Sequence, residues 1–534
     1  MSKFNIVDKR RVTTTGPIAV TSATPTTVTF EGAPAYTRDT KSELFMLAVA
    51  NMVGEDTFYE SAESRDDRYA GLVRSVATQD PEWMLGFIGW LRGTANMRSA
   101  SLVAAAEAVH ARRGAGLQGR NRALVDAALQ RGDEPGEFVA YWRSRFGKAV
   151  PMPVKKGLAD AALRLYTERS ALKYDTPTSA YRFADVLEIA HPKAGTDWQN
   201  ALFEHLLARR HGREDLFRCP DRLPTLQARH NLMQIPAEGR RAILRDSQWL
   251  SQAGMTWEAV SAWLDGPMDK TAWEAVIPSM GLMALARNLR NFDEAGVSDE
   301  MARFVADKFA DPEQVARSRM FPFRWLAAYE HAPSLRWSQP LDQALGASLV
   351  NVPSMPGRTL VLVDTSASMT STGFSARSKM TPAKAAAVFG AALKLKGEQV
   401  DWVGFADGSF VHDVPKGGSL IREVDRFIKR TGEVGHGTQI AAAVRQHFKG
   451  QDRLFVISDM QTTGNAYDTF RGDTFGPVPE TTPVYGVNLG GYAPTVVPAG
   501  QAKRRFEFGG LTDAMFQMVP LLEQGTSQGW PWEV

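Results

Sequence analysis

The chain has 534 residues, and its 62 Lys and Arg against 59 Asp and Glu give a formal net charge of +3 at pH 7. A chain of this length exceeds one ordinary hydrophobic core, so we expect two or more domains. Hydrophobic residues make up 44% and charged residues 23%, as in soluble globular proteins. The near balance of charge excludes a globally basic nucleic-acid-binding protein, so any basic surface must be local.

Cys219 is the only cysteine. A disulfide within the chain is therefore excluded, and a thiolate zinc site is not expected. The N-terminal sequence MSKFNIVDKRRV lacks the apolar core of a secretion signal. No run approaches the 18 or so apolar residues of a membrane-spanning helix. We expect a cytoplasmic protein with no membrane contact.

The N-terminal part of the chain divides into two patterns. Residues 12–35 are rich in Thr, Ser, Pro and Gly, which predicts an extended arm over residues 1–40. From about Lys41 to Gln343 the pattern is helical, with runs such as PEWMLGFIGWLRG and NRALVDAALQRG. Because no pair of such short helices buries its apolar stripe alone, we expect successive pairs to stack into a solenoid over residues 41–352. A compact all-α bundle is the alternative.

The pattern changes after about Val352, near the boundary sequence LVNVPSMPGR. The sequences RTLVLVDTS, QVDWVGFAD, RLFVISDM and TPVYGVNLG predict strands, and TPAKAAAVFGAALKLK and HGTQIAAAVRQHF predict helices. Strands that alternate with helices predict a doubly wound, mostly parallel α/β domain over residues 353–534. In such sheets, ligands bind at the carboxyl ends of the strands.

Oxygen-bearing side chains follow the predicted strands of this domain. Asp364, Ser366 and Ser368 end the first strand, Thr438 lies in the turn VGHGTQ, and Asp459 ends the strand LFVISD. Two carboxylates and three hydroxyls at one sheet edge suit a hard divalent cation (Mg²⁺, Ca²⁺ or Mn²⁺) better than zinc. In the alternative interpretation, the two serines cap the next segment and Asp459 starts a turn.

This set resembles the metal-ion-dependent adhesion site of von Willebrand factor A domains, with all five positions in the expected order. The resemblance implies a Rossmann-like A domain. It also implies that the serines and the threonine bind the cation directly, that the aspartates bind it directly or through water, and that an acidic group of a partner often completes the shell.

The helical region followed by one A domain resembles the Ro (SS-A) autoantigen and its bacterial ortholog Rsr, which define the TROVE module. The stretches RFADVLEIAHPK, MALARNLRNF and SRMFPFRWLAAYEH carry this resemblance. It implies a multi-domain protein, a HEAT-like helical-repeat ring closed by the A domain. The outer surface would bind small noncoding Y RNAs, and the cavity would bind single-stranded ends of misfolded or precursor RNAs. The implied role is RNA quality control, rRNA maturation and decay with an exoribonuclease, especially under stress, by a monomer.

The resemblance also indicates individual RNA contacts. The family histidine at the end of a helix falls on His191, and the lysine of the preceding Lys-Tyr pair falls on Lys173. The arginine that follows in the family has no counterpart here, and Arg182 and Lys193 are the nearest replacements. Phosphate contacts need only positive charge in roughly the right place.

Basic clusters provide further candidates from the residues alone. They are Arg112, Arg113 and Arg120 between His110 and Arg122, Lys155 and Lys156 in PVKKG, and Arg209 and Arg210 in ARRHGRED. Each cluster lies at a predicted helix end or turn, where the loops of a solenoid line a surface. In the alternative interpretation, these side chains offset helix dipoles or form solvated faces.

Three classes of function compete. The first is the RNA-binding ring scaffold. The second is a divalent-metal-dependent protein-binding module of the adhesion or chaperone type, with the helices as a scaffold. The third is an enzyme, but the sequence has no Gly-x-x-x-x-Gly-Lys-Ser/Thr loop, His-Glu-x-x-His or Gly-x-Ser-x-Gly motif. We therefore expect a non-enzymatic protein of the first class.

Overall fold

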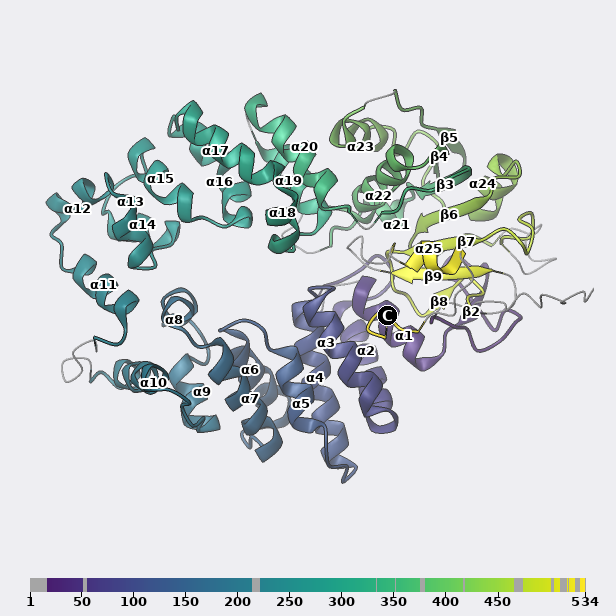
Figure 1. Cartoon of the computed structure of the whole chain (residues 1–534). Helices are drawn as coiled ribbons and strands as arrows, with labels where there is room; N and C mark the ends of the chain where they lie inside the picture. The colour runs from purple at the N-terminus through teal and green to yellow at the C-terminus, as the bar shows by residue number, and fades with distance from the viewer. Residues whose placement is uncertain are drawn as a thin grey trace, which may run out of the picture. The chain divides into compact units, whose positions relative to one another are not determined.

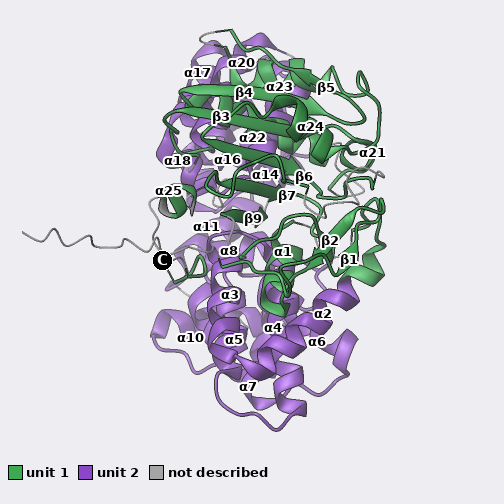
Figure 2. Cartoon of the chain, turned by 90° about the vertical axis from the view of Figure 1, so that its right-hand side faces the viewer, with its two compact units in different colours: residues 1–65, 349–534 green, residues 66–348 purple. Residues whose placement is uncertain are grey.

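The chain forms two compact units in a computed structural model (Figures 1 and 2). Unit 1 consists of Met1–Arg65 and Leu349–Val534, and unit 2 of Asp66–Ser348. The structure describes residues 17–50, 55–213, 221–332, 334–350, 352–374, 380–415, 418–464, 474–500, 504–509, 516, 518–523 and 529–533, so that Cys219 lies outside it.

All the regular secondary structure in the described residues of unit 2 is helical. Its helices are α2 (Ala62–Gln79, whose first residues belong to unit 1), α3 (Pro81–Gly93), α4 (Arg98–Gly114), α5 (Asn121–Ala128), α6 (Glu134–Phe146), α7 (Met152–Leu165), α8 (Glu168–Tyr174), α9 (Phe183–Ala190), α10 (Asp197–Arg210), α11 (Pro224–Met233), α12 (Ala237–Ile243), α13 (Ser247–Gln252), α14 (Trp257–Trp263), α15 (Lys270–Val276), α16 (Leu282–Glu294), α17 (Asp299–Ala310), α18 (Pro312–Ser318), α19 (Pro322–His331) and α20 (Ser338–Ala347), with 3₁₀ turns η2 (Ile277–Ser279) and η3 (Leu335–Trp337). In the described residues, no helix is both long and apolar enough to cross a membrane.

The helices of unit 2 pack on helices that are near them in the chain (Figure 1). Helix α4 contacts α3, α5 and α6; α7 contacts α5 and α9; α11 contacts α8 and α13; and α17 contacts α16, α18 and α20. In a bundle, helices distant in sequence would share one core. The sequential contacts favour the predicted stacking of helical pairs.

Side-chain caps explain where several of these helices begin. Asp80 accepts a hydrogen bond from the backbone N–H of Trp83 at 3.0 Å, and Pro81 occupies the first helical position, where no N–H is needed. The same type of cap is made by Thr167, Thr196, Asp246, Thr256, Asp269, Ser298 and Asp311. These Asp, Ser and Thr residues between the apolar runs therefore mark helix starts.

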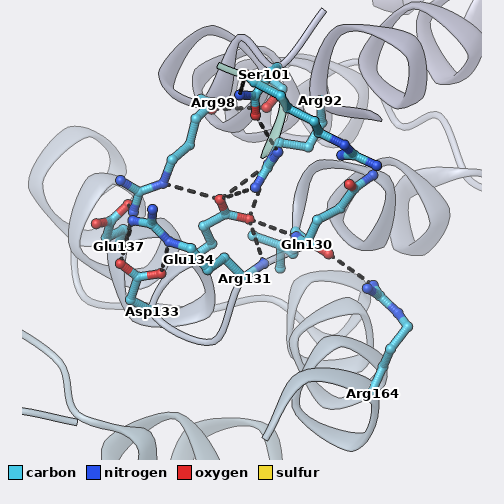
Figure 3. A network of polar contacts seen from close by, with 12 residues as sticks. Arg92, Arg98, Ser101, Gln130, Arg131, Asp133, Glu134, Glu137 and Arg164 are labelled. Carbon is cyan, nitrogen blue, oxygen red and sulfur yellow. Dashed lines mark hydrogen bonds and ion pairs between the residues drawn. The ribbon is translucent and has the colours of Figure 1, made fainter. Parts of the chain in front are cut away.

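A buried carboxylate joins three helices of unit 2 (Figure 3). Glu134 is fully buried at the start of α6. Its Oε1 accepts hydrogen bonds from Arg92 Nη2 on α3 at 2.7 Å and from Arg98 Nε on α4 at 3.1 Å. Its Oε2 accepts from the backbone N–H groups of Gln130 at 2.6 Å and Arg131 at 3.0 Å. Arg92 Nε donates to the same carboxylate, so one side chain satisfies five donors and fixes the ends of α3 and α4 against α6.

Unit 1 contains a six-stranded sheet. Its strands are β3 (Arg358–Asp364), β4 (Gln399–Phe405), β5 (Ser409–Val411), β6 (Arg453–Ser458), β7 (Val484–Asn488) and β9 (Arg505–Gly509), and the helices of unit 1 are α1 (Thr40–Ala50), α21 (Ala367–Thr370), α22 (Pro382–Lys396), α23 (Leu420–Ile428), α24 (Ile440–His447) and α25 (Met518–Glu523). The strand order is β5-β4-β3-β6-β7-β9 (Figure 2), and every pair except β4 with β5 is parallel.

The mostly parallel α/β sheet and its four predicted strands are confirmed. The chain leaves β3 on one side to form β4 and returns on the other side to form β6, so the direction of winding reverses at β3. Ligands of open α/β sheets bind at such a reversal, outside the carboxyl ends of the strands. Asp364 ends β3, and Asp459 directly follows β6.

The N-terminal residues belong to the same compact unit as this sheet, so the predicted boundary between residues 40 and 41 is not seen. Strands β1 (Thr27–Val28) and β2 (Pro34–Thr37) form an antiparallel three-stranded sheet with β8 (Pro494–Thr495). Helix α1 packs on β9. The Thr- and Pro-rich pattern indicated an extended segment correctly, but it could not reveal the partner strand far along the chain.

A buried ion pair fastens this N-terminal segment. Arg38 Nη2 and Nε contact Glu507 Oε1 and Oε2 at 2.6 Å and 2.7 Å, and neither side chain is exposed. Glu507 Oε1 also accepts from Asn488 Nδ2 and Thr495 Oγ1, each at 2.9 Å, and Arg38 Nη1 donates to the carbonyl of Tyr492 at 2.8 Å. Both charges are therefore paired and hydrogen-bonded, which their burial requires.

We predict that Glu134→Gln destabilises the protein by about 3–5 kcal/mol, because it leaves the buried Arg92 without its counter-ion. Urea unfolding followed by circular dichroism measures this loss. Glu137→Gln is the matched control, since Glu137 pairs with the same Arg98 but its side chain is 46% exposed, and it should cost no more than about 1 kcal/mol. Equal losses in the two variants would refute the role assigned to Glu134.

Candidate functional site

The five oxygen-bearing residues predicted as cation ligands are all buried at one edge of the sheet: Asp364, Ser366, Ser368, Thr438 and Asp459. The backbone links the three segments that carry them. The N–H of Ala367 donates to the carbonyl of His436 at 2.9 Å, which joins the β3 end to the loop before α24. The N–H of Thr463 donates to the carbonyl of Thr438 at 2.7 Å, which joins that loop to the β6 end.

The serine hydroxyls do not cap the helix that follows them. Ser366 is at the N-cap position of α21, but its side chain makes no capping hydrogen bond. Instead, the Oγ atoms of Ser366 and Ser368 lie 3.2 Å apart. The two hydroxyls therefore lie within hydrogen-bond distance of each other rather than on the backbone of α21, which disfavours the capping interpretation.

The two carboxylates differ in how well they are satisfied. Asp364 Oδ1 accepts from the N–H of Ser366 at 2.8 Å, and Oδ2 accepts from Ser458 Oγ at 2.5 Å. Asp459 Oδ1 accepts from the N–H of Gln461 at 3.1 Å, whereas Oδ2 is buried and has no hydrogen-bond partner among the described residues. Such an orphaned carboxylate oxygen is costly unless a positive charge meets it.

The protonation of both carboxyl groups reflects this environment. Burial raises the pKa of Asp364. Burial, and then the nearby charge of Asp364, raises the pKa of Asp459. Two carboxylates in one desolvated site repel each other, and a bound cation would reverse that repulsion.

The donor set fits a hard divalent cation. Among the described residues, no cluster of three or more His, Cys, Asp or Glu side chains could hold a metal ion. A site built on His and Cys, as zinc prefers, is therefore not indicated. The ligands offered here are carboxylate and hydroxyl oxygens, which suit Mg²⁺, Ca²⁺ or Mn²⁺. Ser368 and Asp459 line a cavity of about 20 Å³, which has room for one water-sized species.

Sequence reasoning missed Asp407, which positions the loop that carries Thr438. Asp407 Oδ2 accepts hydrogen bonds from the N–H groups of His436 at 2.9 Å and Gly437 at 3.1 Å. A Cβ atom at Gly435 or Gly437 would collide with Asp407, and Gly435 has a φ of +94°. The two glycines in VGHGT were the only signal of this tight turn.

A second candidate site lies in unit 2. The turn between α4 and α5 and the start of α7 enclose a cleft of about 550 Å³, lined by Arg113, Gly116, Leu117, Gln118, Gly119, Arg120, Asn121, Arg122, Met152, Pro153 and Lys156. Three of these residues are candidates from the basic clusters: Arg113, Arg120 and Lys156. The structure therefore brings two separate sequence clusters to one cleft.

The cations of this cleft are not equivalent. Arg120 Nε contacts Glu82 Oε1 at 2.5 Å, and Arg122 is paired with Asp160. Arg113 and Lys156 are exposed, and within the described residues their side chains make no ion pair or hydrogen bond. Met152 beside them is 61% exposed. The cleft thus combines uncompensated positive charge with accessible apolar surface.

Arg112 requires a correction. The sequence analysis included it among the RNA-contact candidates, but it is only 3% exposed. Its guanidinium donates to Asn121 Oδ1 at 2.9 Å and to the carbonyl of Ala77 at 2.7 Å. Arg112 is therefore a structural residue that joins α4 to α2 and α5, because its guanidinium donates to groups of those two helices.

The side chains of Arg182 and Arg209 also make structural contacts, both with Asp175. Arg182 Nη2 contacts Asp175 Oδ2 at 2.9 Å, and Arg209 Nη2 donates to the Asp175 carbonyl at 3.1 Å. Because Asp175 is buried, these contacts hold the segment between α8 and α9 rather than offering free donors. Arg210 Nε contacts Asp185 Oδ1 at 2.8 Å and stays partly exposed.

The other RNA-contact candidates remain accessible. Lys173, His191 and Lys193 are exposed, and Lys155 is half-buried at the start of α7. His191 ends α9 in the left-handed conformation with a φ of 48°. Nothing in the geometry assigns these residues to a ligand, so they stay predictions.

Comparison with known proteins gives two findings. Residues 250–336 match the family model of the TROVE domain. The fold is similar to the crystal structure of the Ro (Rsr) protein of Deinococcus radiodurans, with a TM-score of 0.60, 18% identity, and coverage of 89% of this chain and 99% of that chain. No curated protein sequence matches the chain. One segment of the chain thus matches the TROVE domain, and the fold is similar to that of a Ro protein.

We predict that Mg²⁺ raises the melting temperature of the wild-type protein but not that of Asp459→Asn. At a hundredfold excess over Kd, a bound cation adds about 2.7 kcal/mol. This corresponds to about 5–10 °C for a unit of this size. Without Mg²⁺, Asp459→Asn should melt higher than the wild type, because it removes a buried charge whose Oδ2 has no partner.

Differential scanning calorimetry with Mg²⁺ or EDTA measures both effects. Asp425→Asn is the matched control, since Asp425 is an exposed carboxylate of unit 1 paired with Lys429 at 2.7 Å. It should keep the full Mg²⁺ response. A response of Asp459→Asn as large as that of the wild type would exclude Asp459 as a ligand.

Proposed function

We propose that this chain is an RNA-binding protein of the Ro type, which binds RNA through the basic cleft of unit 2. The TROVE match and the similarity to the Rsr fold support this class. The observation that carries the proposal is the pair Arg113 and Lys156, exposed cations without counter-ions at one cleft. In a protein with a net charge of only +3, this cleft is a local basic surface to which a polyanionic ligand would bind.

The chemistry of the cleft suits a single-stranded segment. Phosphate oxygens would pair with Arg113 and Lys156, and each neutralised phosphate releases counterions. The side chain of Met152 offers an apolar surface against which a base can pack. Arg120 could exchange Glu82 for a phosphate, because both partners of that ion pair are more than half exposed and the pair is worth little.

The finer features of the function follow from the family resemblance. They are a HEAT-like ring closed by a von Willebrand factor A domain, Y RNA on the outer surface, and misfolded or precursor RNA ends in the cavity. They also include collaboration with an exoribonuclease in RNA maturation and decay under stress. The parallel sheet with its buried Asp364 and Asp459 supports an A domain with a divalent cation. We propose a binding role rather than a catalytic one.

A divalent-metal-dependent protein-binding role is the second candidate, and the orphaned oxygen of Asp459 favours it. The two roles differ in their dependence on metal. RNA binding through the cleft should survive EDTA, because no residue of the cleft belongs to the cation site. Binding of an acidic protein partner at the sheet edge should be lost with EDTA and with Asp364→Ala.

We predict that Arg113→Ala combined with Lys156→Ala weakens binding of a single-stranded oligoribonucleotide about tenfold. It should also reduce the slope of log K against log salt by about 1.4, which is about 0.7 for each lost phosphate contact. Fluorescence anisotropy over a range of salt concentrations measures both effects. The control variant, Lys270→Ala with Arg303→Ala, removes two exposed cations elsewhere in unit 2 and should change neither value.

We predict separately that Lys173→Ala combined with His191→Ala weakens a structured Y-like RNA more than a single-stranded oligomer. Gel shifts with both RNAs measure the difference. Because both side chains are exposed, folding should be unaffected, as circular dichroism can verify. Unchanged affinity for the structured RNA would remove these two residues from the interface without affecting the prediction for the cleft.

A further inference from the structure

Two aromatic rings of unit 2 form a stack next to the basic cleft. The imidazole of His110 on α4 is parallel to the phenyl ring of Phe146, the last residue of α6, with the centroids 3.9 Å apart and an interplanar angle of 7°. Helices α4 and α6 pack on each other (Figure 1). The stack therefore belongs to the contact between two helices of the same unit.

The ring of Phe146 is fixed by its neighbours. It meets the ring of Trp142 at 4.9 Å with an interplanar angle of 64°, and that of Tyr141 at 6.2 Å with an angle of 80°. Trp142 is only 2% exposed, and its Nε1 donates to the carbonyl of Ala149 at 2.9 Å. Phe146 is thus a firm support for the ring that stacks on it.

His110 is the outer ring of the pair. It is exposed, and its ring nitrogens make no hydrogen bond within the described residues. Because Phe146 covers one face of the imidazole, the exposure of His110 comes from its edge and its opposite face. A flat ring that is held in place and open to solvent is the kind of surface on which unpaired bases stack in RNA-binding proteins.

The stack is close to the cleft along two stretches of chain. His110 and Arg113 are three residues apart on α4, so they lie on the same face of that helix with a rise of about 4.5 Å between them. Residues 147–151 join Phe146 to Met152, which lines the cleft, and they include the exposed cation Lys148. One nucleotide can therefore place its base on His110 and its phosphate beside Arg113.

The imidazole offers ring surface rather than charge. Burial lowers the pKa of His110, and nearby arginines, Arg113 among them, act in the same direction. Because the ordinary pKa of histidine is about 6.5, the ring is neutral at pH 8. A neutral ring beside free cations separates the two tasks of a nucleotide site, base stacking and phosphate pairing.

We propose that the stack of His110 on Phe146 is a platform for one unpaired base of the RNA strand whose phosphates pair with Arg113 and Lys156. The strand then passes along α4 from the stack to the cleft, where Met152 packs against a second base. The platform selects a single strand, because a base inside a duplex has both of its faces covered. This inference rests on the RNA binding proposed above for the cleft.

The test compares His110→Ala and His110→Phe with the wild type, using an oligouridylate and a ribose-phosphate strand of the same length without bases. Fluorescence anisotropy at pH 8 should show that His110→Ala binds the oligouridylate about five- to a hundredfold more weakly, the range for one stacked base. The base-free strand should bind equally to the three proteins. The slope of log K against log salt should not change, since no phosphate contact is lost. His110→Phe should keep the wild-type affinity, because it keeps a ring.

His230→Ala is the control, because His230 is also an exposed histidine of unit 2 but lies on α11, and it should bind both strands as the wild type does. Unchanged affinity of His110→Ala for the oligouridylate would overturn the platform and leave the cleft intact. An equal loss for the base-free strand, or a smaller salt slope, would also overturn it, because His110 would then contact phosphate. Absence of oligouridylate binding to the wild type would instead overturn the RNA binding proposed for the cleft, and with it this inference.

Chemical modification provides a readout that needs no variant. In the wild type, bound oligouridylate should slow the reaction of His110 with diethyl pyrocarbonate, as mass spectrometry can measure, because the stacked base covers the imidazole. The base-free strand at saturation should protect His110 less. Equal protection by the two strands would overturn the platform, since the bases would then contribute nothing at His110.

Discussion

The buried ion pair between Arg38 and Glu507 is the constraint on which the arrangement of unit 1 depends. It joins residues 469 positions apart. Both carboxylate oxygens of Glu507 accept hydrogen bonds from Arg38, and one of them also accepts from Asn488 and Thr495. Because neither charge could remain buried without the other, the N-terminal segment cannot leave the sheet without a large free-energy cost. This contact fastens the segment between β2 and α1 to strand β9.

The cation site and the basic cleft illustrate two ways of handling charge. At the sheet edge, Asp364 and Asp459 are buried close together, so their negative charges repel each other, and a bound cation would relieve that repulsion. At the cleft, Arg113 and Lys156 stay in water, where a lone charge costs little. The first site therefore suits the small cation that we propose, and the second suits a large ligand with many weak contacts.

Much of this could be predicted from the sequence where the signal was local. The apolar run before Asp364 and the Thr-Pro start of α22 identified their elements, because a buried strand and a capped helix leave short-range patterns. The five oxygen-bearing residues of the candidate cation site could be grouped because parallel strands end at the same edge. The pairing of β2 with β8 could not be predicted, since β8 is a strand of only two residues, Pro494–Thr495. The burial of Arg112 could not be predicted either, because Arg112 and the exposed Arg113 are adjacent arginines that differ only in the face of α4 on which they lie.

The division of the chain into units has a consequence for biosynthesis. Unit 2 is continuous, and its helices pack on near neighbours in sequence, so it can fold while the ribosome is still translating the rest. The segment around Arg38 emerges first, but Glu507 emerges only after the whole helical unit has been made. Until then β2 lacks its partner strand β8, and Arg38 lacks its counter-ion.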